Sequence, residues 1–313
     1  MDKKLLFLDC DPGVDDAVAI LLALADPEAQ VLGIGAVGGN VPLERTLRNA
    51  LDLAAFAGRP DLPVYPGAAA PLSCPAIDAA DFHGEDGLGG IKLPQSLAAP
   101  REEMAWDALH RLARANPGRL TAVVTGPCTN LAIALTKWSD LPGLLKEVVI
   151  MGGASAFGNT TPAAEFNFLA DPEAAEAVFQ SGVKITLCPL DVTHKCYLTA
   201  EETSAIAALG SPQAEFAVHM IGDGRAELYE ARFGVPGSIM HDPAAVLYAL
   251  RPELFTAKEC WCGVETGGTH CRGKLVTDAF TDAKRDVNAR LCYDVDRPAF
   301  VAALTELLGR YSH

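Results

Sequence analysis

Short apolar segments recur along the chain, and a stretch with the composition of a helix follows most of them. The apolar segments, none of which alternates polar with apolar positions, are residues 4–9, 31–37, 120–124, 148–151 and 183–187. Helix-forming sequence follows at residues 15–25, 43–57, 131–138 and 172–180. Unalternated strands separated by helices are typical of a parallel sheet that is buried on both faces. The pattern predicts an α/β fold with a mostly parallel, Rossmann-like sheet flanked by helices, and with functional residues at the carboxyl ends of the strands.

Two long stretches interrupt this alternation of strands and helices. We predict that they form smaller lid-like regions on a single domain spanning residues 1–313. Residues 66–100 are rich in Ala, Pro and Gly and are too long for an ordinary connection. Residues 211–241 are expected to form a helix and then a turn containing Gly and Pro. C-terminal strands are predicted at 260–265, 274–276 and 287–293, before a final helix at 298–308.

The charge balance excludes several classes of partner. Lys and Arg number 25 against 40 for Asp and Glu, a net charge of −15, so no cationic surplus is available for a nucleic acid backbone. The longest apolar run is residues 17–25, against the ~18 residues needed to span a bilayer, so we expect no membrane partner. The apolar run at 5–8 is too short for a signal peptide, which predicts a cytoplasmic location. The nine cysteines include no Cys-x-x-Cys pair and are expected to be reduced and mostly buried.

Four carboxylates crowd the end of the first predicted strand, where residues 9–16 read DCDPGVDD. Helix capping explains one or two acids at such a position, but not four. Pro12 and Gly13 allow a tight turn that brings Asp11 back towards Asp15 and Asp16. Because the donors are all oxygen, the cluster favours a hard cation, Ca²⁺ or Mg²⁺, over Zn²⁺.

The DxDPGxDD pattern at 9–16 resembles the motif of the inosine-uridine preferring nucleoside hydrolases. Further motifs of that family follow in the same order: GN at 39–40, HGxxG at 83–87, TGxxTN at 125–130, MGG at 151–153, GN at 158–159, AEFN at 164–167, DPEAA at 171–175 and HDP at 241–243. Together they extend over residues 9–243, which makes the resemblance more specific than any single motif. It implies hydrolysis of the N-glycosidic bond of ribonucleosides to free base and ribose.

The resemblance also implies a set of roles for individual residues. The side chains of Asp11, Asp15, Asp16 and Asp242 and the backbone carbonyl of Thr125 would surround a Ca²⁺ ion. Such chemistry needs an activated water on one face of the sugar and a protonated base leaving from the other. Asp11 would be the general base, and His241 the acid that protonates the departing base.

Substrate contacts are implied for a second group of residues. Asn40, Asn159, Glu165 and Asn167 would bind ribose hydroxyls, while His83, Met151, Phe166 and Tyr229 would line the rest of the site. We expect residues 164–167 to be extended, with Glu165 and Asn167 on one side.

The part of the site that would contact the base is open to two interpretations. Tyr229 and Phe233, at i and i+4, fit a packing pair as well as they fit a stacking platform. Arg225 stands where purine-accepting relatives often have an aromatic residue, and Gly38 where a bulkier residue is commoner. These departures leave the preference for purine or pyrimidine open.

Two other functions compete with the hydrolase. Asp9 and Asp11 after a first strand also resemble the nucleophile and acid of a haloacid dehalogenase-type, Mg²⁺-dependent phosphohydrolase. The third hypothesis is a non-catalytic nucleoside- or pentose-binding protein that keeps the acidic cluster. Homo-oligomers, as dimers or tetramers, are common in the resembled family and are expected here.

Overall fold

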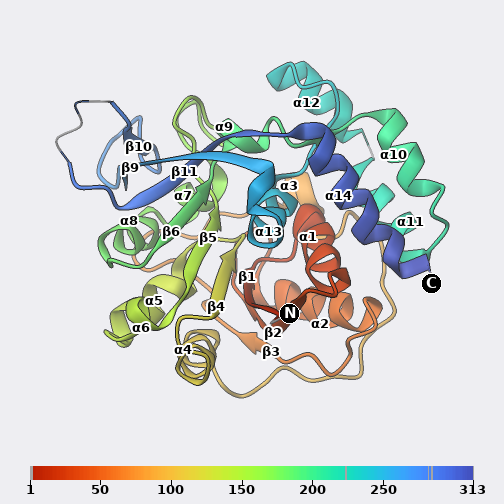
Figure 1. Ribbon diagram of the computed structural model, residues 1–313, viewed down its shortest axis with the longest axis horizontal. Helices are drawn as coiled ribbons and strands as arrows, with labels where there is room; N and C mark the ends of the chain where they lie inside the picture. Colours follow the sequence, from red (N-terminus) through yellow and green to blue (C-terminus); the bar gives the residue numbers. More distant parts are fainter. Residues whose placement is uncertain (1–2, 223, 281, 283–284, 313) are drawn as a thin grey trace.

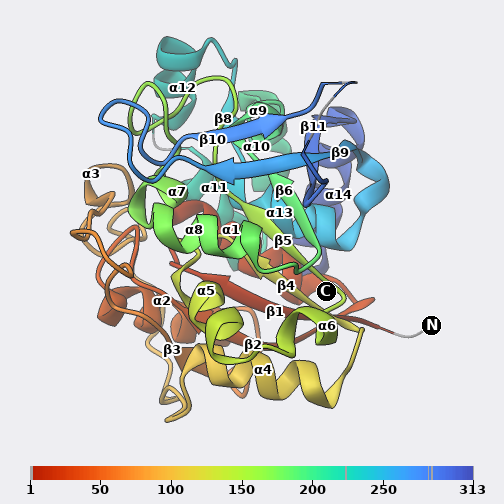
Figure 2. The ribbon, with the colours of Figure 1, turned by 90° about the vertical axis from the view of Figure 1, so that its left-hand side faces the viewer.

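The computed structural model describes residues 3–222, 224–280, 282 and 285–312. The strands of its main sheet are β1 (Lys4–Cys10), β2 (Ala29–Ala36), β3 (Val64–Pro66), β4 (Leu120–Val124), β5 (Glu147–Met151), β6 (Ile185–Cys188), β9 (Phe255–Val264), β10 (Leu275–Asp278) and β11 (Ala289–Val295). They are ordered β10-β9-β11-β6-β5-β4-β1-β2-β3 (Figure 1). All pairs from β3 to β11 are parallel, and β9 pairs antiparallel with both β11 and β10. Figure 2 shows β9 and β10 at one edge of the sheet and β3 at the other.

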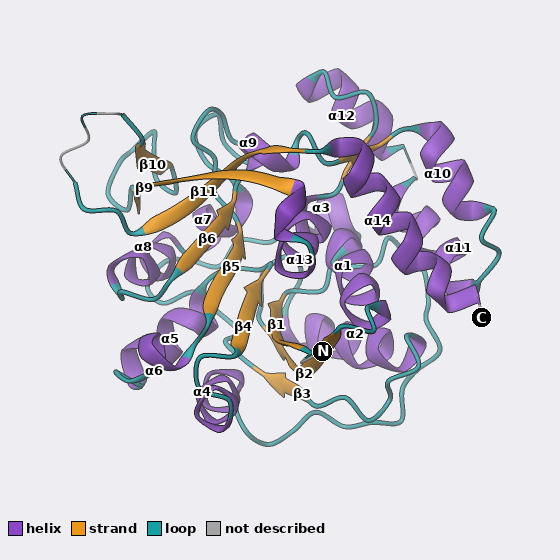
Figure 3. Ribbon diagram, viewed as in Figure 1, coloured by secondary structure: helices purple, strands orange, loops and turns teal. Residues whose placement is uncertain are grey.

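Helices cover both faces of the sheet (Figure 3). One face carries α1 (Val14–Ala25), α2 (Leu43–Phe56), α11 (Pro212–Ile221), α13 (His241–Leu250) and α14 (Arg297–Gly309). The other carries α4 (Ala105–Ala115), α5 (Thr129–Lys137), α6 (Leu141–Leu144) and α8 (Pro172–Gln180). In β1, Leu6 and Leu8 enter the core beneath α1, whereas Leu5 and Phe7 enter the opposite core. Because successive side chains of a strand point to opposite faces, a strand with two buried faces is apolar throughout.

The order of the strands reverses beside β1. The chain runs from β1 outward to β2 and β3, and then returns to the other side of β1 for β4, β5 and β6. Open parallel sheets bind ligands at such a reversal, at the carboxyl ends of the strands. The backbone N–H of Thr125, just after β4, donates to Asp9 O at 2.9 Å, and that of Val37, just after β2, donates to Cys10 O at 3.0 Å. The ends of β1, β2 and β4 therefore lie side by side.

The remaining elements lie around the carboxyl end of the sheet. They are α3 (Ala80–His83), α7 (Phe166–Ala170), α9 (Leu190–Thr193), α10 (Ala200–Ala207) and α12 (Arg225–Phe233), with the two-stranded ribbon β7 (Tyr197–Leu198) and β8 (Ser238–Ile239). Single turns of 3₁₀ helix occur at Pro252–Leu254 and Arg310–Ser312. No helix in the described residues is long and apolar enough to cross a membrane.

The predicted fold class is confirmed as a single α/β domain with a mostly parallel sheet. Residues 1–2 and 313 of the predicted span lie outside the described part of the chain. The segment 211–241 was expected to hold one helix, but it contains α11 and α12. Helices α4 and α13 and the short strand β3 were not predicted. Seven of the nine cysteines are buried, and all carry free thiols.

The prediction that residues 164–167 are extended is wrong from Phe166 onward, although Glu165 itself has an extended backbone. Glu165 is the N-cap of α7, and Asn167 lies in its first turn. The Glu165 carboxylate accepts hydrogen bonds from the backbone N–H groups of Asn167 and Phe168, which otherwise have no partner at a helix start. This capping stabilises a helix where the alternating pattern indicated an extended segment.

Candidate active site

A pocket with a volume of about 150 Å³ opens at the carboxyl ends of β1, β4 and β5. Part of its lining is formed by carboxylates at the starts of α1 and α13, and we call this part the acid end. Another part is formed by two histidines and a group of aromatic rings, and we call it the base end. The polar residues between the two ends come from the loops after β2 and β5 and from α7.

Three carboxylates form the acid end. Asp15 and Asp16 lie in the first turn of α1, and Asp242 lies in the first turn of α13. One oxygen atom from each lies within 4.8 Å of the other two. The contact between α1 and α13 holds the two helix starts together. Like charges at this distance repel, so the trio needs either protons or a cation.

Asp11 lies beneath the trio and is completely buried. Its Oδ2 accepts the backbone N–H of Asn40 at 2.7 Å, whereas its Oδ1 has no hydrogen-bond partner in the described residues. Room for this carboxylate comes from Gly39 and Gly126, since a Cβ at either would collide with it. Burial and the neighbouring Asp16 hold the pKa of Asp11 well above its ordinary value.

The pKa values of the other buried acids move in the same direction. Burial and Asp15 raise the pKa of Asp16 to about 7, and burial and Asp15 raise the pKa of Asp242 well above its ordinary value. Asp16 accepts the Thr125 hydroxyl at 2.8 Å, and the Asn40 amide donates to it at 3.2 Å. These donors do not offset the loss of hydration, so the carboxylates cannot all be ionised without a cation. The oxygen-only donor set and the unpaired Asp11 Oδ1 fit a hard divalent ion.

A second group of possible metal ligands differs from the acid end, because protein groups already balance its charges. Cys74, Asp171 and Glu173 also bring ligand atoms within 4.8 Å of one another. Asp171, however, accepts the Thr129 hydroxyl at 2.7 Å, and Glu173 pairs with Arg272 at 2.7 Å. Hydrogen bonds and a guanidinium already balance these charges, so this group does not call for a metal.

Polar side chains between the two ends are anchored through one atom each. The Asn40 amide nitrogen donates to Asp11 O, and that of Asn167 donates to Thr125 O at 2.8 Å. Asn159 Oδ1 accepts the backbone N–H of Phe166 at 3.0 Å. In the described structure this leaves Asn40 Oδ1, Asn159 Nδ2 and Asn167 Oδ1 without protein partners. They are two acceptors and one donor with fixed positions, as recognition of a sugar requires.

Glu165 is buried at the same place. Its carboxylate accepts three backbone N–H groups, the shortest from Gly153 at 2.7 Å. Burial raises the pKa of Glu165 to about 7 in spite of these donors.

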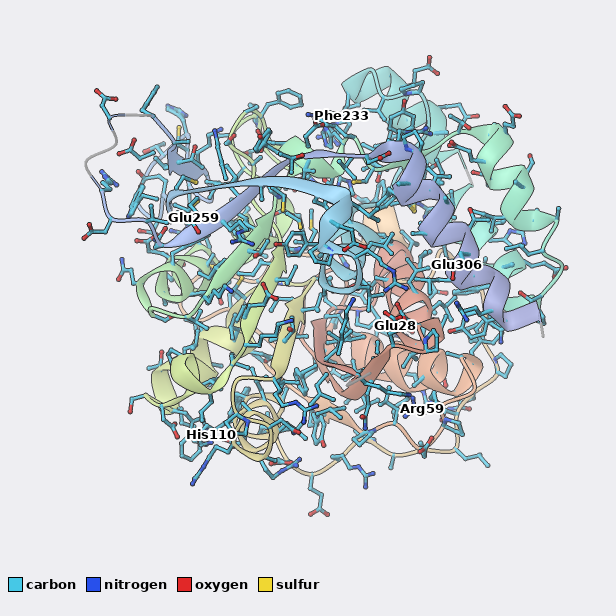
Figure 4. All side chains as sticks on the ribbon, viewed as in Figure 1. Glu28, Arg59, His110, Phe233, Glu259 and Glu306 are labelled. Atoms are coloured by element: carbon cyan, nitrogen blue, oxygen red, sulfur yellow. The ribbon has the colours of Figure 1, made fainter. Side chains whose placement is uncertain are left out.

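The base end is built from rings on three separate segments. Phe82 precedes His83, and Tyr229 and Phe233 come from α12; Figure 4 shows Phe233 near α12. The centroid of the Tyr229 ring lies 6.1 Å from that of Phe82, 6.3 Å from that of Phe233 and 5.9 Å from that of His241. These are ordinary distances for packed aromatic pairs. The rings form an apolar wall that a flat base could contact.

The two histidines of the pocket are held at Nδ1 by different partners. His83 Nδ1 accepts the backbone N–H of Val14 at 3.1 Å, so the neutral ring carries its proton on Nε2. Burial lowers the pKa of His83 to about 4. His241 Nδ1 lies 2.8 Å from the hydroxyl of Thr193, and burial lowers the pKa of His241 as well.

Twelve of the fourteen predicted site residues line this one pocket. They are Asp15, Asn40, His83, Thr125, Met151, Asn159, Glu165, Phe166, Asn167, Tyr229, His241 and Asp242. The other two, Asp11 and Asp16, are buried beneath its acid end. The structure thus brings all fourteen together, while their roles stay predictions.

Six lining residues were not predicted: Ala79, Phe82, Thr160, Leu228, Arg232 and Phe233. Most belong to the base end. The one signal for them in the sequence was the spacing of Tyr229 and Phe233, which a packing pair explains equally well. Arg225 and Gly38 do not line the pocket. Arg225 lies over the Phe82 ring instead, with its guanidinium carbon 5.3 Å from the ring centroid.

The family model described as inosine-uridine preferring nucleoside hydrolase matches residues 6–302 of this chain. The chain belongs to this family. The pyrimidine-specific ribonucleoside hydrolase RihA of Citrobacter koseri is 42% identical over 307 residues, which cover 98% of each chain. RihA of Escherichia coli K12 is also 42% identical over 307 residues, covering 98% of this chain and 99% of the relative.

Two solved structures share the fold over almost their whole length. The plant nucleoside hydrolase PpNRh1 has a TM-score of 0.91 and 31% identity, covering 97% of this chain and 98% of that one. The purine-preferring ribonucleoside hydrolase from Gardnerella vaginalis has a TM-score of 0.91 and 32% identity, covering 99% of each. The nucleoside hydrolase described here is accordingly an enzyme that acts on the N-glycosidic bond of ribonucleosides. Membership decides against the phosphohydrolase hypothesis.

Proposed function

We propose that the hydrolase cleaves pyrimidine ribonucleosides to free base and ribose, with Ca²⁺ bound at the acid end of the pocket. The observation that carries this proposal is the trio of carboxylates within 4.8 Å of one another beside a pocket that His241 also lines. The pyrimidine preference is supported by the 42% identical relatives, which are named pyrimidine-specific.

The metal would be held by Asp11, Asp15, Asp16, Asp242 and the carbonyl oxygen of Thr125. Thr125 O accepts one hydrogen bond, from Asn167, and keeps a second lone pair for a cation. When bound, a divalent ion neutralises the crowded acids, makes a nearby water more acidic and holds vicinal hydroxyls of a ribose.

Asp11 is proposed as the general base. Its Oδ1 is buried and has no hydrogen-bond partner in the described residues, so it can accept a proton from the attacking water. The Asn40 N–H fixes the other oxygen and therefore the plane of the carboxylate. The hydroxide equivalent then bonds to C1′ of the ribose as the bond to the base breaks.

His241 is proposed to supply a proton to the departing base. Its ring lines the base end, next to Tyr229. Negative charge develops on the base as the glycosidic bond lengthens, and a proton held at Nε2 would neutralise it. Burial lowers the pKa of His241, which makes the protonated ring a stronger acid but leaves fewer rings protonated at neutral pH.

The ribose is proposed to be bound through Asn40 Oδ1, Asn159 Nδ2, Asn167 Oδ1 and the carboxylate of Glu165. Met151 and Phe166 line the pocket beside them and would contact the apolar face of the sugar. His83 would donate from Nε2, because its Nδ1 is occupied by Val14.

A substrate panel tests the proposal. Uridine, cytidine, inosine and adenosine are incubated with the enzyme in calcium, and released ribose is measured as reducing sugar. We expect kcat/KM for the pyrimidine nucleosides to exceed that for the purine nucleosides by at least about tenfold, a difference of about 1.4 kcal/mol in transition-state binding. Faster purine hydrolysis would overturn the preference. Binding of uridine in calorimetry without release of ribose would favour a non-catalytic binding protein, and p-nitrophenyl phosphate serves as the negative control.

Two further expectations go beyond the pocket. We propose a homo-oligomer, dimer or tetramer, and a cytoplasmic location. The second is supported by the nine free thiols, since reducing compartments preserve them. Light scattering and fractionation of the source cells would test the two expectations.

A further inference from the structure

The hydroxyl of Thr193 lies 2.8 Å from Nδ1 of His241, and both residues are buried. We infer that Thr193 is a positioning residue that holds the His241 ring with its Nε2–H directed to the departing base. This inference rests on the proposed role of His241 as the acid. It adds to that role the residue that sets the orientation and the proton position of the ring.

The fold holds the two residues together from both sides. Thr193 ends α9, and its backbone N–H donates to Pro189 O at 3.0 Å. Four residues later the chain enters β7, which pairs with β8 just before His241. The backbone N–H of Met240 also donates to Cys196 O at 2.7 Å. The two backbones are therefore fixed, and the side chains meet without either segment having to move.

Other neighbours of the His241 ring do not fix its orientation. The ring centroids of Tyr229 and His194 lie 5.9 Å and 5.8 Å from that of His241, in tilted or edge-on packing. Such contacts limit the space around the ring, but they accept no specific proton. Within the described residues, Thr193 is the hydrogen-bond partner of the ring.

A hydroxyl suits an acid better than a carboxylate would. The Thr193 hydroxyl donates to Nδ1 when the ring is neutral, which places the ring proton on Nε2. A hydroxyl can both donate and accept, and it carries no charge, so it orients the ring through Nδ1 without adding a charged group beside it. His83 differs, because a backbone N–H at Nδ1 can only donate.

The test uses two substrates with different leaving groups. Uridine needs a proton on its departing base, whereas p-nitrophenyl riboside releases a stable phenolate without one. Thr193→Val, which keeps the shape and removes the hydroxyl, should lower kcat for uridine about tenfold, the equivalent of one hydrogen bond, with KM nearly unchanged. It should lower kcat for p-nitrophenyl riboside by less than about twofold. Thr193→Ser, which restores the hydroxyl, should recover most of the uridine activity.

Thr186→Val is the matched control, because it makes the same exchange at a buried threonine of β6 outside the pocket. It should leave the ratio of the two activities unchanged. Equal losses on both substrates in Thr193→Val, or no recovery in Thr193→Ser, would overturn the inference. His241→Ala separates the two claims. If that variant loses both activities equally, the acid role itself fails; if it loses uridine activity selectively while Thr193→Val does not, only the positioning role fails.

Discussion

The acid end and the base end of the pocket are built by different means. At the acid end, each carboxylate follows a strand or begins a helix, and hydrogen bonds from Thr125, Asn40 and Gly13 fix the oxygens of Asp11 and Asp16. At the base end, rings from residues 82–83 and from α12 pack on one another, with few hydrogen bonds between them. One end is positioned by the backbone of the sheet, and the other by the packing of side chains.

This difference has a functional consequence. Electrostatic groups that act on the reacting bond need fixed positions, because their contribution depends steeply on geometry. An apolar wall for a flat base tolerates exchange of one ring for another, so preference for a base can change while the chemistry is retained. We therefore expect substitutions at the acid end to affect every substrate alike, and substitutions at the base end to discriminate between substrates.

Asp11→Asn should have the largest effect. The amide keeps the shape of the side chain but cannot accept the proton of the water, so kcat should fall by about 10³ or more for uridine and for p-nitrophenyl riboside alike. Steady-state kinetics on both substrates would measure this. A loss confined to uridine would contradict the separation of the two ends.

Asp171→Asn is the control for the loss of a buried carboxylate. Asp171 is as fully buried as Asp11 but lies outside the pocket. This variant should unfold at a lower temperature, because Asp171 accepts the Thr129 hydroxyl, yet its kcat should stay within a few-fold of that of the parent.

His241→Ala should have the next largest effect, and a selective one. Loss of the acid should lower kcat for uridine by about 10², at the lower end of the range for general acids, and should lower it far less for p-nitrophenyl riboside. The ratio of the two kcat values is the readout. An unchanged ratio would remove His241 from the proton transfer.

Phe233→Ala should act on binding. Stacking of a base on an aromatic ring is worth about 1–3 kcal/mol, so KM for uridine should rise about tenfold while calcium affinity stays the same. Phe280→Ala, at a 77% exposed ring outside the pocket, is the control. A change in calcium affinity in Phe233→Ala would show that the two ends are coupled.

The smallest expected effect concerns stability. The pKa of Asp16 is raised to about 7 in the folded chain, above its ordinary value of 3.8. The folded state therefore binds more protons than the unfolded state between about pH 4 and pH 7, and this contribution to stability is lost as pH rises through that window. With a chelator present, the Tm of the parent minus the Tm of Asp16→Asn should fall by about 2 °C or more between pH 4 and pH 8.

With calcium at pH 8, the Tm of the parent should instead exceed that of Asp16→Asn, because the ionised Asp16 then binds the cation. Differential scanning calorimetry of both chains, with chelator and with calcium, would measure this. A difference in Tm between the parent and Asp16→Asn that does not depend on pH would contradict a raised pKa of Asp16 in the folded chain.

The acid end could be predicted from the sequence, whereas at the base end His83, Tyr229 and His241 could be predicted but the rings of Phe82 and Phe233 could not. The motif at 9–16 places its acids next to a strand end, and the order of the strands in a parallel sheet brings Thr125 and Asn40 to the same edge. Such relations follow from local sequence and topology.

The rings of Phe82 and Phe233 both pack against Tyr229, which depends on tertiary packing of two segments that are far apart in the chain. Aromatic residues at i and i+4 of a helix do not show which face they present. Residues 166–167 were misjudged for a related reason: Glu165 caps a helix, and a short alternating pattern does not distinguish a helix start from a continued extended segment.

The central claim is that a divalent ion makes the crowded carboxylates of the acid end compatible with one another and with catalysis. Elemental analysis of the purified, active enzyme, before and after dialysis against a chelator, tests this most directly. The account predicts about one Ca²⁺ per chain, loss of uridine hydrolysis when it is removed, and recovery when Ca²⁺ is returned. An active enzyme that contains no divalent metal and is insensitive to the chelator would contradict it.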